Sequence, residues 1–188
     1  MRKELFLELR KIKSWSMSNK VLDVVLFGSA ARGKSVPKDV DICILINDKD
    51  EKKSLDLVDS LGLVTDKFKN KFHVSIVQAS DFIAGTGLSK ILLLEGYSIC
   101  RSKPFSEELG FKNVSLFVYT LKSFSKSRRV QFHYLLKGRG SSKGLLAEVG
   151  AKFISDGIIE INIEKEDLLR EVFDQWEVKY SIRRGLLE

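Results

Sequence analysis

The feature that most limits how this chain can fold is a short polar connection between two apolar segments. Residues 21–27 are almost wholly apolar and end at Gly28-Ser29, and a second apolar segment begins at Asp39. Short apolar runs bounded by turn residues predict strands, and the unbroken apolar finish of the second predicts burial on both faces. Pro37 lies in the connection, so no long helix can separate the two strands.

The carboxylates at the start of the second strand predict a cation site. Asp39 and Asp41 are two residues apart, so on a strand their side chains project from the same face. Mg²⁺ is usually bound by one or two carboxylates together with substrate phosphates and water. The preceding turn offers backbone N–H groups and the Ser29 hydroxyl to phosphate oxygens. Turn and carboxylates together predict a site for a nucleoside triphosphate and its metal ion.

A second pattern covers the same residues. The segment from Gly28 to Ser35 satisfies the G-x-x-x-x-G-K-[ST] pattern of P-loop ATPases. A P-loop must open directly into a long helix, whereas here Pro37 follows two residues later and a strand begins at Asp39. The ATPase interpretation is therefore rejected.

Three short motifs carry a family resemblance. Leu26-Phe27-Gly28-Ser29, Arg32-Gly33 and Asp39-Val40-Asp41-Ile42 resemble the signature of the DNA polymerase β-like nucleotidyltransferase superfamily, especially its minimal prokaryotic-type members. The resemblance covers roughly the first half of the chain and implies an α/β (α+β) fold, a mixed sheet flanked by helices. It also implies that Gly28, Ser29 and Arg32 contact the triphosphate. Asp39 and Asp41 would be the catalytic metal ligands, for Mg²⁺ or Mn²⁺.

One departure from the family pattern concerns a third carboxylate. The family supplies it from a neighbouring strand, and the matching stretch here, residues 72–76, contains no acid. Depending on register, the position falls on His73 or Ser75, while Asp66 and Asp81 lie outside the predicted strand. A strand histidine can accept a proton, although one of this kind more often has only a packing or surface role.

The second part of the chain is basic in its first half. We expect domains at 1–103 and 104–188, because from Leu109 to Ala147 no acidic residue occurs. A helix is predicted over 115–137, followed by a Gly-rich loop, a strand at 158–161, a helix at 167–175 and a strand at 178–182, which makes a second small α+β domain.

The basic residues of this part are candidates for nucleic-acid contact. On the predicted helix the apolar side chains share one face and basic side chains another, which indicates a core stripe and a charged stripe. The charged stripe could follow a phosphate backbone, or it could be an ordinary solvated face. The candidate residues are Lys122, Lys126, Arg128, Arg129, Lys137 and Arg139. The net charge of +7 favours anionic partners in either case.

Composition excludes several other classes. No apolar run is long enough to span a membrane, and we expect a cytoplasmic protein. Two cysteines and two well-separated histidines are too few for a disulfide framework or a zinc cluster.

Three hypotheses for the function follow from these observations. The leading one is a Mg²⁺-dependent enzyme that transfers a nucleoside monophosphate from an NTP, such as ATP, to RNA, a protein or a small molecule. The second is a catalytically impaired module that binds nucleotide or nucleic acid. The third, by analogy alone, is an antitoxin-type protein that binds a protein partner.

Overall fold

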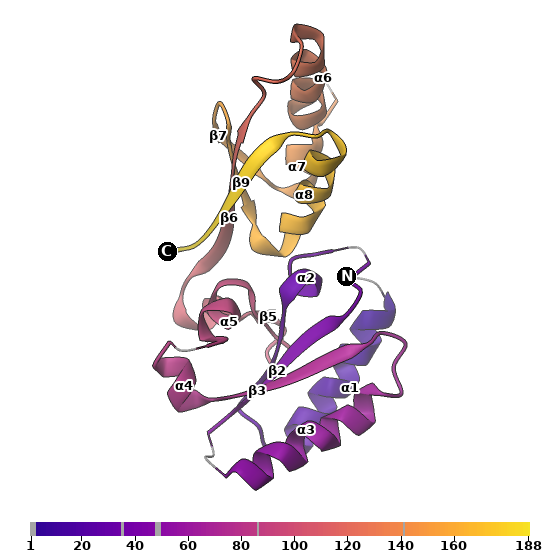
Figure 1. Cartoon of the computed structure of the whole chain (residues 1–188), viewed down its shortest axis with the longest axis vertical. Helices are drawn as coiled ribbons and strands as arrows, with labels where there is room; N and C mark the ends of the chain where they lie inside the picture. The colour runs from indigo at the N-terminus through magenta and orange to yellow at the C-terminus, as the bar shows by residue number, and fades with distance from the viewer. Residues whose placement is uncertain (1–2, 35, 48–49, 86, 141) are drawn as a thin grey trace. The chain divides into compact units, whose positions relative to one another are not determined.

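The computed structural model describes residues 3–34, 36–47, 50–85, 87–140 and 142–188. Ser35, the last residue of the rejected P-loop pattern, lies outside the described residues. The chain divides into two compact units, Met1–Phe111 together with Glu188, and Lys112–Leu187, and each has its own sheet (Figure 1).

The first unit contains a mixed sheet in the order β3-β2-β1-β4-β5. Strands β1 and β2 are antiparallel, and β2 and β3 are parallel. Strand β4 pairs antiparallel with both β1 and β5. The predicted mixed sheet flanked by helices is therefore confirmed. The strands are β1 (Asp23–Phe27), β2 (Val40–Ile46), β3 (Phe72–Gln78), β4 (Tyr97–Ser98) and β5 (Lys103–Pro104).

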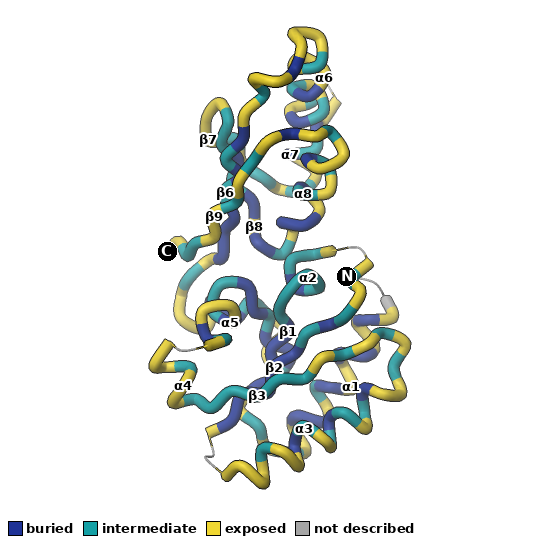
Figure 2. Tube along the Cα trace, viewed as in Figure 1, coloured by how far each residue is buried: buried dark blue, intermediate teal, exposed yellow. Residues whose placement is uncertain are grey.

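Helices cover both faces of this sheet. Alternation along β1 and β2 sends Val24, Leu26 and Ile42 into one core, and Val25 and Cys43 into another. The first core is closed by α1 (Lys3–Asn19) and α3 (Glu51–Thr65), and the second by α4 (Ala79–Ile83), α5 (Ser89–Glu95) and η1 (Phe105–Leu109). Every residue of β2 from Ile42 onward is buried, as its apolar sequence predicted (Figure 2).

The second unit is an antiparallel sheet with helices packed on it. The strand order is β7-β8-β6-β9, and all three pairings are antiparallel. Aromatic rings form its core, with Phe117, Phe132 and Phe173 fully buried and in edge contact. The elements are β6 (Lys112–Thr120), α6 (Lys126–Lys137), α7 (Leu145–Val149), β7 (Lys152–Ser155), β8 (Ile158–Asn162), η2 (Ile163–Lys165), α8 (Glu166–Gln175) and β9 (Lys179–Leu187).

The predicted helix over 115–137 is wrong in its first part. Residues up to Thr120 belong to strand β6, and the helix begins only at Lys126, after Ser125, whose hydroxyl accepts from the Arg128 N–H. Phe117 and Phe124 are both buried, but they reach the core from a strand and from a loop. The apolar residues of this segment have helical spacing, but the same spacing also occurs in strands. Residues up to Thr120 are rich in aromatic and β-branched side chains, which favour a strand.

The unit boundary falls at Phe111/Lys112, later in the chain than the expected position at Lys103. Strand β5 pairs with β4, and Phe105 is buried against the first unit's sheet, so the chain leaves that unit only after η1. Among the described residues, no helix is long and apolar enough to cross a membrane.

Candidate active site

The Gly28-Ser29 turn and the second aspartate meet at the end of the β1–β2 pair. Phe27, the last residue of β1, is paired with Asp41, so the chain turns at Gly28 directly beside that carboxylate. Gly28 has a φ of +72°, and a Cβ at this position would lie 2.6 Å from Asp41 Oδ2. Only glycine satisfies both conditions, since a side chain here would be strained and would collide with the carboxylate.

The turn continues into a single helical turn, α2 (Gly28–Ala31), in which Ser29 is half-buried. The Arg32 N–H donates to the Gly28 carbonyl at 3.1 Å, and the Lys34 N–H donates to the Ser29 carbonyl at 3.0 Å. These backbone bonds fix the turn that presents the Ser29 hydroxyl.

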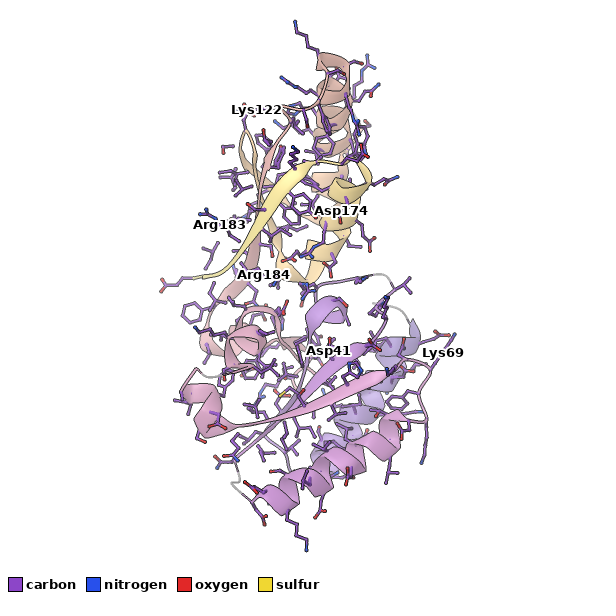
Figure 3. The ribbon with its side chains drawn as sticks, in the orientation of Figure 1. Asp41, Lys69, Lys122, Asp174, Arg183 and Arg184 are labelled. Atoms are coloured by element: carbon purple, nitrogen blue, oxygen red, sulfur yellow. The ribbon has the colours of Figure 1, made fainter. Side chains whose placement is uncertain are left out.

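Asp39 and Asp41 each have a basic neighbour, one just before β3 and one on it. Lys71 Nζ lies 3.8 Å from Asp39 Oδ1, and His73 Nδ1 lies 3.5 Å from Asp41 Oδ1. The carboxylates remain about one-third exposed, at 35% and 34% of their side-chain surface. Ion pairs between exposed side chains are weak, so a bound cation or phosphate group can replace the direct Lys71–Asp39 and His73–Asp41 contacts. Figure 3 shows Asp41 among the side chains of the first unit.

The register of β2 and β3 settles which residue stands beside Asp41. The two parallel strands pair Asp41 with His73, and Ser75 is paired with Cys43, further along β2. The position from which a neighbouring strand could supply a third carboxylate is therefore occupied by an imidazole. In the described parts of the chain, no group of three or more His, Cys, Asp or Glu side chains is arranged to hold a metal ion.

The two carboxylates nevertheless fit a magnesium ion bound together with a substrate. Magnesium keeps several waters and is usually held by one or two carboxylates and the phosphates of a nucleotide. Asp39 and Asp41 supply that number of carboxylates, both about one-third exposed, and Asp41 lies against the Gly28 turn. Their donor set suits Mg²⁺ or Mn²⁺ better than softer metals.

Arg32 has a partner inside the fold. Its Nη1 lies 2.5 Å from Glu95 Oε2 on α5, and their side chains are 14% and 7% exposed. This ion pair ties the end of the Gly-Ser turn to the helix that covers the sheet. A direct phosphate contact by Arg32 thus stays a prediction, and the structure adds a structural role that the sequence did not indicate. Glu95 could not be found from sequence, since it lies 63 positions away.

The structure divides the six basic candidates of the second unit by their contacts. Arg128 donates to the Trp176 carbonyl and lies over the Phe124 ring, 4.5 Å from its centroid. Arg129 donates to the carbonyls of Leu121, Lys122 and Phe124. Arg128 therefore ties the start of α6 to the end of α8, and Arg129 ties it to the segment that precedes α6.

The other four candidates are exposed. Lys137 and Arg139 lie over the rings of Phe153 and Tyr134, at 3.5 and 5.2 Å from the centroids. Lys122, labelled in Figure 3 in the segment before α6, and Lys126 make no side-chain hydrogen bond or ion pair with any described residue. Lys122 and Arg129 also line a cavity of about 300 Å³, along with Tyr119, Thr120, Leu121, His133, Asp156 and Gly157.

Comparison with known proteins gives a match to one family, and two of the similar solved structures are described here. Residues 10–102 match the family described as polymerase beta, nucleotidyltransferase. A chain in the structure of a tri-AMPylated Shewanella oneidensis HEPN toxin with its MNT antitoxin is 19% identical, with a TM-score of 0.37, over 68% of this chain and 90% of that one. A chain in a mutant of the MntA-HpeT toxin-antitoxin pair is 18% identical, with a TM-score of 0.39, over 67% and 91%. No curated protein matches the sequence.

The family match encloses every residue of the site described above. It begins within α1 and ends just before β5, so it includes the turn, both aspartates, β3 and Glu95. The resemblance inferred from the three short motifs is confirmed by this match. Residues 10–102 of this chain form a nucleotidyltransferase domain of the polymerase β family.

Proposed function

We propose that the protein is a Mg²⁺-dependent nucleotidyltransferase that moves a nucleoside monophosphate from an NTP to an acceptor hydroxyl. The observation that carries the proposal is the contact between Gly28 and Asp41, which puts a phosphate-binding turn and a metal-binding carboxylate side by side. Asp39 lies directly before β2, two residues from Asp41, and is one-third exposed. Because residue 28 has no side chain, a triphosphate on the turn would lie close to Asp41, and a cation between them would join its phosphate oxygens to the carboxylate.

The chemistry assigned to the site is an in-line displacement. The acceptor oxygen forms a bond to the α-phosphorus, the bond from that phosphorus to the β-phosphate oxygen breaks, and pyrophosphate leaves. The hydroxyl proton passes to a base or to solvent. A bound divalent cation supplies positive charge for the phosphate oxygens, and Asp39 and Asp41 are the residues that would hold it. The backbone N–H groups of Gly28 and Ser29 would orient the triphosphate.

The test is transfer of label from each α-³²P-NTP, with Mg²⁺ or Mn²⁺, to RNA or to proteins of a cell lysate. An Asp39→Asn/Asp41→Asn variant should lose the transfer. The matched control is Asp56→Asn/Asp59→Asn, which removes the same charge from exposed positions on α3. Label transfer that survives the loss of Asp39 and Asp41 would refute the proposal. The nature of the labelled product identifies the acceptor as RNA or protein.

A second candidate, nucleotide binding without turnover, is favoured by His73 at the position of a third carboxylate. It predicts that α,β-methylene-ATP binds in the presence of Mg²⁺ and that no NTP labels any acceptor. The same binding should be lost in Asp39→Asn/Asp41→Asn, which separates this candidate from a protein with no nucleotide site.

We further propose that the second unit binds the acceptor when that acceptor is a nucleic acid. Lys122 and Lys126 support the proposal, because both are exposed and neither is paired with another described side chain. Lys122 also lines the cavity of about 300 Å³ that Arg129 lines. Ammonium groups in this condition are available to phosphates, and such contacts depend on salt and not on sequence.

A further inference from the structure

The side of the site formed by β3 presents positive or neutral groups to the aspartates. The register of β2 and β3 places His73 beside Asp41. Lys71 precedes His73 by two residues and lies next to Asp39. Both side chains are largely exposed, at 72% for Lys71 and 53% for His73. Their backbone positions are fixed beside β2, by the pairing of His73 with Asp41 and by the hydrogen bond from the Val40 N–H to the Lys71 carbonyl. Both side chains therefore remain at the edge of the site even when a ligand displaces the weak direct pairs.

The charge at this site limits how many cations it can hold. Two divalent cations in one phosphoryl-transfer site stand about 3.5–4 Å apart and repel each other strongly, so they need several anionic oxygens around them. The described part of the site offers two carboxylates, and the Lys71 ammonium 3.8 Å from Asp39 offsets one of their charges. Oxygen is also the ligand that Mg²⁺ and Mn²⁺ prefer, and the group nearest Asp41 on β3 is an imidazole.

We propose that this site takes one divalent cation, held by Asp39 and Asp41, and that Lys71 and His73 occupy the side from which a second would be held. The proposal rests on the proposed function, because it concerns the same cation. It makes this domain a one-cation site in which Lys71 supplies part of the positive charge that faces the phosphates. Replacing His73 with a carboxylate should therefore create a second cation position.

The test counts the Mn²⁺ that is retained with the full chain in equilibrium dialysis. Excess α,β-methylene-ATP is present on both sides of the membrane, so the Mn²⁺ held by free nucleotide cancels in the difference, and binding is read out without any turnover. Wild type should bind one Mn²⁺ per chain, and His73→Asp should bind two. The matched control is Asn47→Asp, which adds a carboxylate to the exposed residue just after β2. That residue is about 20 Å from Asp41 along the strand, so its variant should still bind one.

Each outcome bears on a different claim. Two Mn²⁺ ions on wild type would overturn the one-cation proposal, whatever the variant does. A folded His73→Asp protein that still binds one ion would also overturn it, with folding checked by its circular dichroism melting curve. If wild type binds no more Mn²⁺ than Asp39→Asn/Asp41→Asn does, the proposed function itself fails. A count of one on wild type that is lost in the double variant supports both.

Discussion

Replacing Gly28 with alanine should damage nucleotide binding far more than it damages folding. The new Cβ would lie 2.6 Å from Asp41 Oδ2, closer than a carbon and an oxygen can approach. The atom it meets is the far end of a side chain that is about one-third exposed, so the carboxylate can rotate away. Rotation of the Asp41 side chain thus relieves the clash at little cost in stability, but it moves the carboxylate out of position to bind the cation.

The cost in stability comes mainly from the backbone. A residue with a Cβ in the left-handed region costs about 1–2 kcal/mol, which corresponds to about 2–8 °C in Tm for a chain of this size. Gly110 offers the matched control, because its φ is +80° and no atom lies within 4 Å of a Cβ placed there. Gly110→Ala should therefore lose a similar amount of stability and keep full nucleotide affinity.

The assay compares both variants by thermal unfolding and by calorimetric titration with α,β-methylene-ATP and Mg²⁺. We expect the Gly28→Ala affinity to fall at least tenfold, because losing one of two carboxylate ligands removes more than about 1.4 kcal/mol of binding. Equal affinity of the Gly28→Ala and Gly110→Ala proteins would refute the reasoning, since it would show that the position of Asp41 does not matter to the nucleotide.

Three further predictions concern ion pairs and the basic segment. Arg32→Ala should lower the free energy of unfolding in urea by about 3–5 kcal/mol, because it leaves Glu95 buried without this partner. Glu166→Gln should cost about 1.5–3 kcal/mol, since this fully buried carboxylate accepts hydrogen bonds from Ser115 and from the charged Arg184. Lys122→Ala/Lys126→Ala should weaken RNA binding and reduce the slope of log K against log salt by about 1.5.

The Glu166 prediction has a pH dependence. Burial raises its pKa, but the hydrogen bonds from Arg184 and Ser115 and the charges of Arg184 and Arg170 outweigh that effect, so the pKa of Glu166 lies below its usual value. The unfolded chain therefore binds this proton more readily than the folded one. The stabilisation is complete above about pH 4.3, the ordinary glutamate pKa, and is lost as pH falls through the folded value. An unfolding difference between wild type and Glu166→Gln that does not shrink in acid would contradict this.

Controls for the other two predictions come from the same chain. Glu95→Gln/Arg32→Gln removes both charges of the pair and should cost less than Arg32→Ala, because no buried charge is left behind. Lys52→Ala/Lys67→Ala removes two exposed lysines from the first unit and should leave the salt slope of RNA binding unchanged. If both double variants lose the same amount of RNA binding, the net positive charge of the protein drives association, and the surface that carries Lys122 and Lys126 has no special role.

Local sequence was sufficient for the parts of the site that lie close together in the chain. Gly28 and Asp41 are joined by one short connection, and Phe27 pairs with Asp41. The sequence also predicted a strand from Asp39, whereas β2 begins one residue later, at Val40. Pro37 and the early start of the second strand were enough to reject a P-loop. The sequence also indicated β8, α8 and β9, although β9 extends to Leu187, beyond the expected end. The hairpin partner β7 (Lys152–Ser155) was missed, because four partly exposed residues carry too little pattern.

Tertiary structure decided everything that depends on which distant residues meet. Only the pairing of β2 with β3 shows that His73 and not Ser75 stands beside Asp41, because a strand's own pattern does not fix its register with a parallel neighbour. Arg32 met Glu95, and Arg128 and Arg129 met backbone carbonyls, through contacts that no local spacing encodes. The Gly-Ser turn and the two aspartates thus lie in one chain segment and can be recognised from sequence. The charged residues around them come from distant segments, so only the packed fold shows which ones they are.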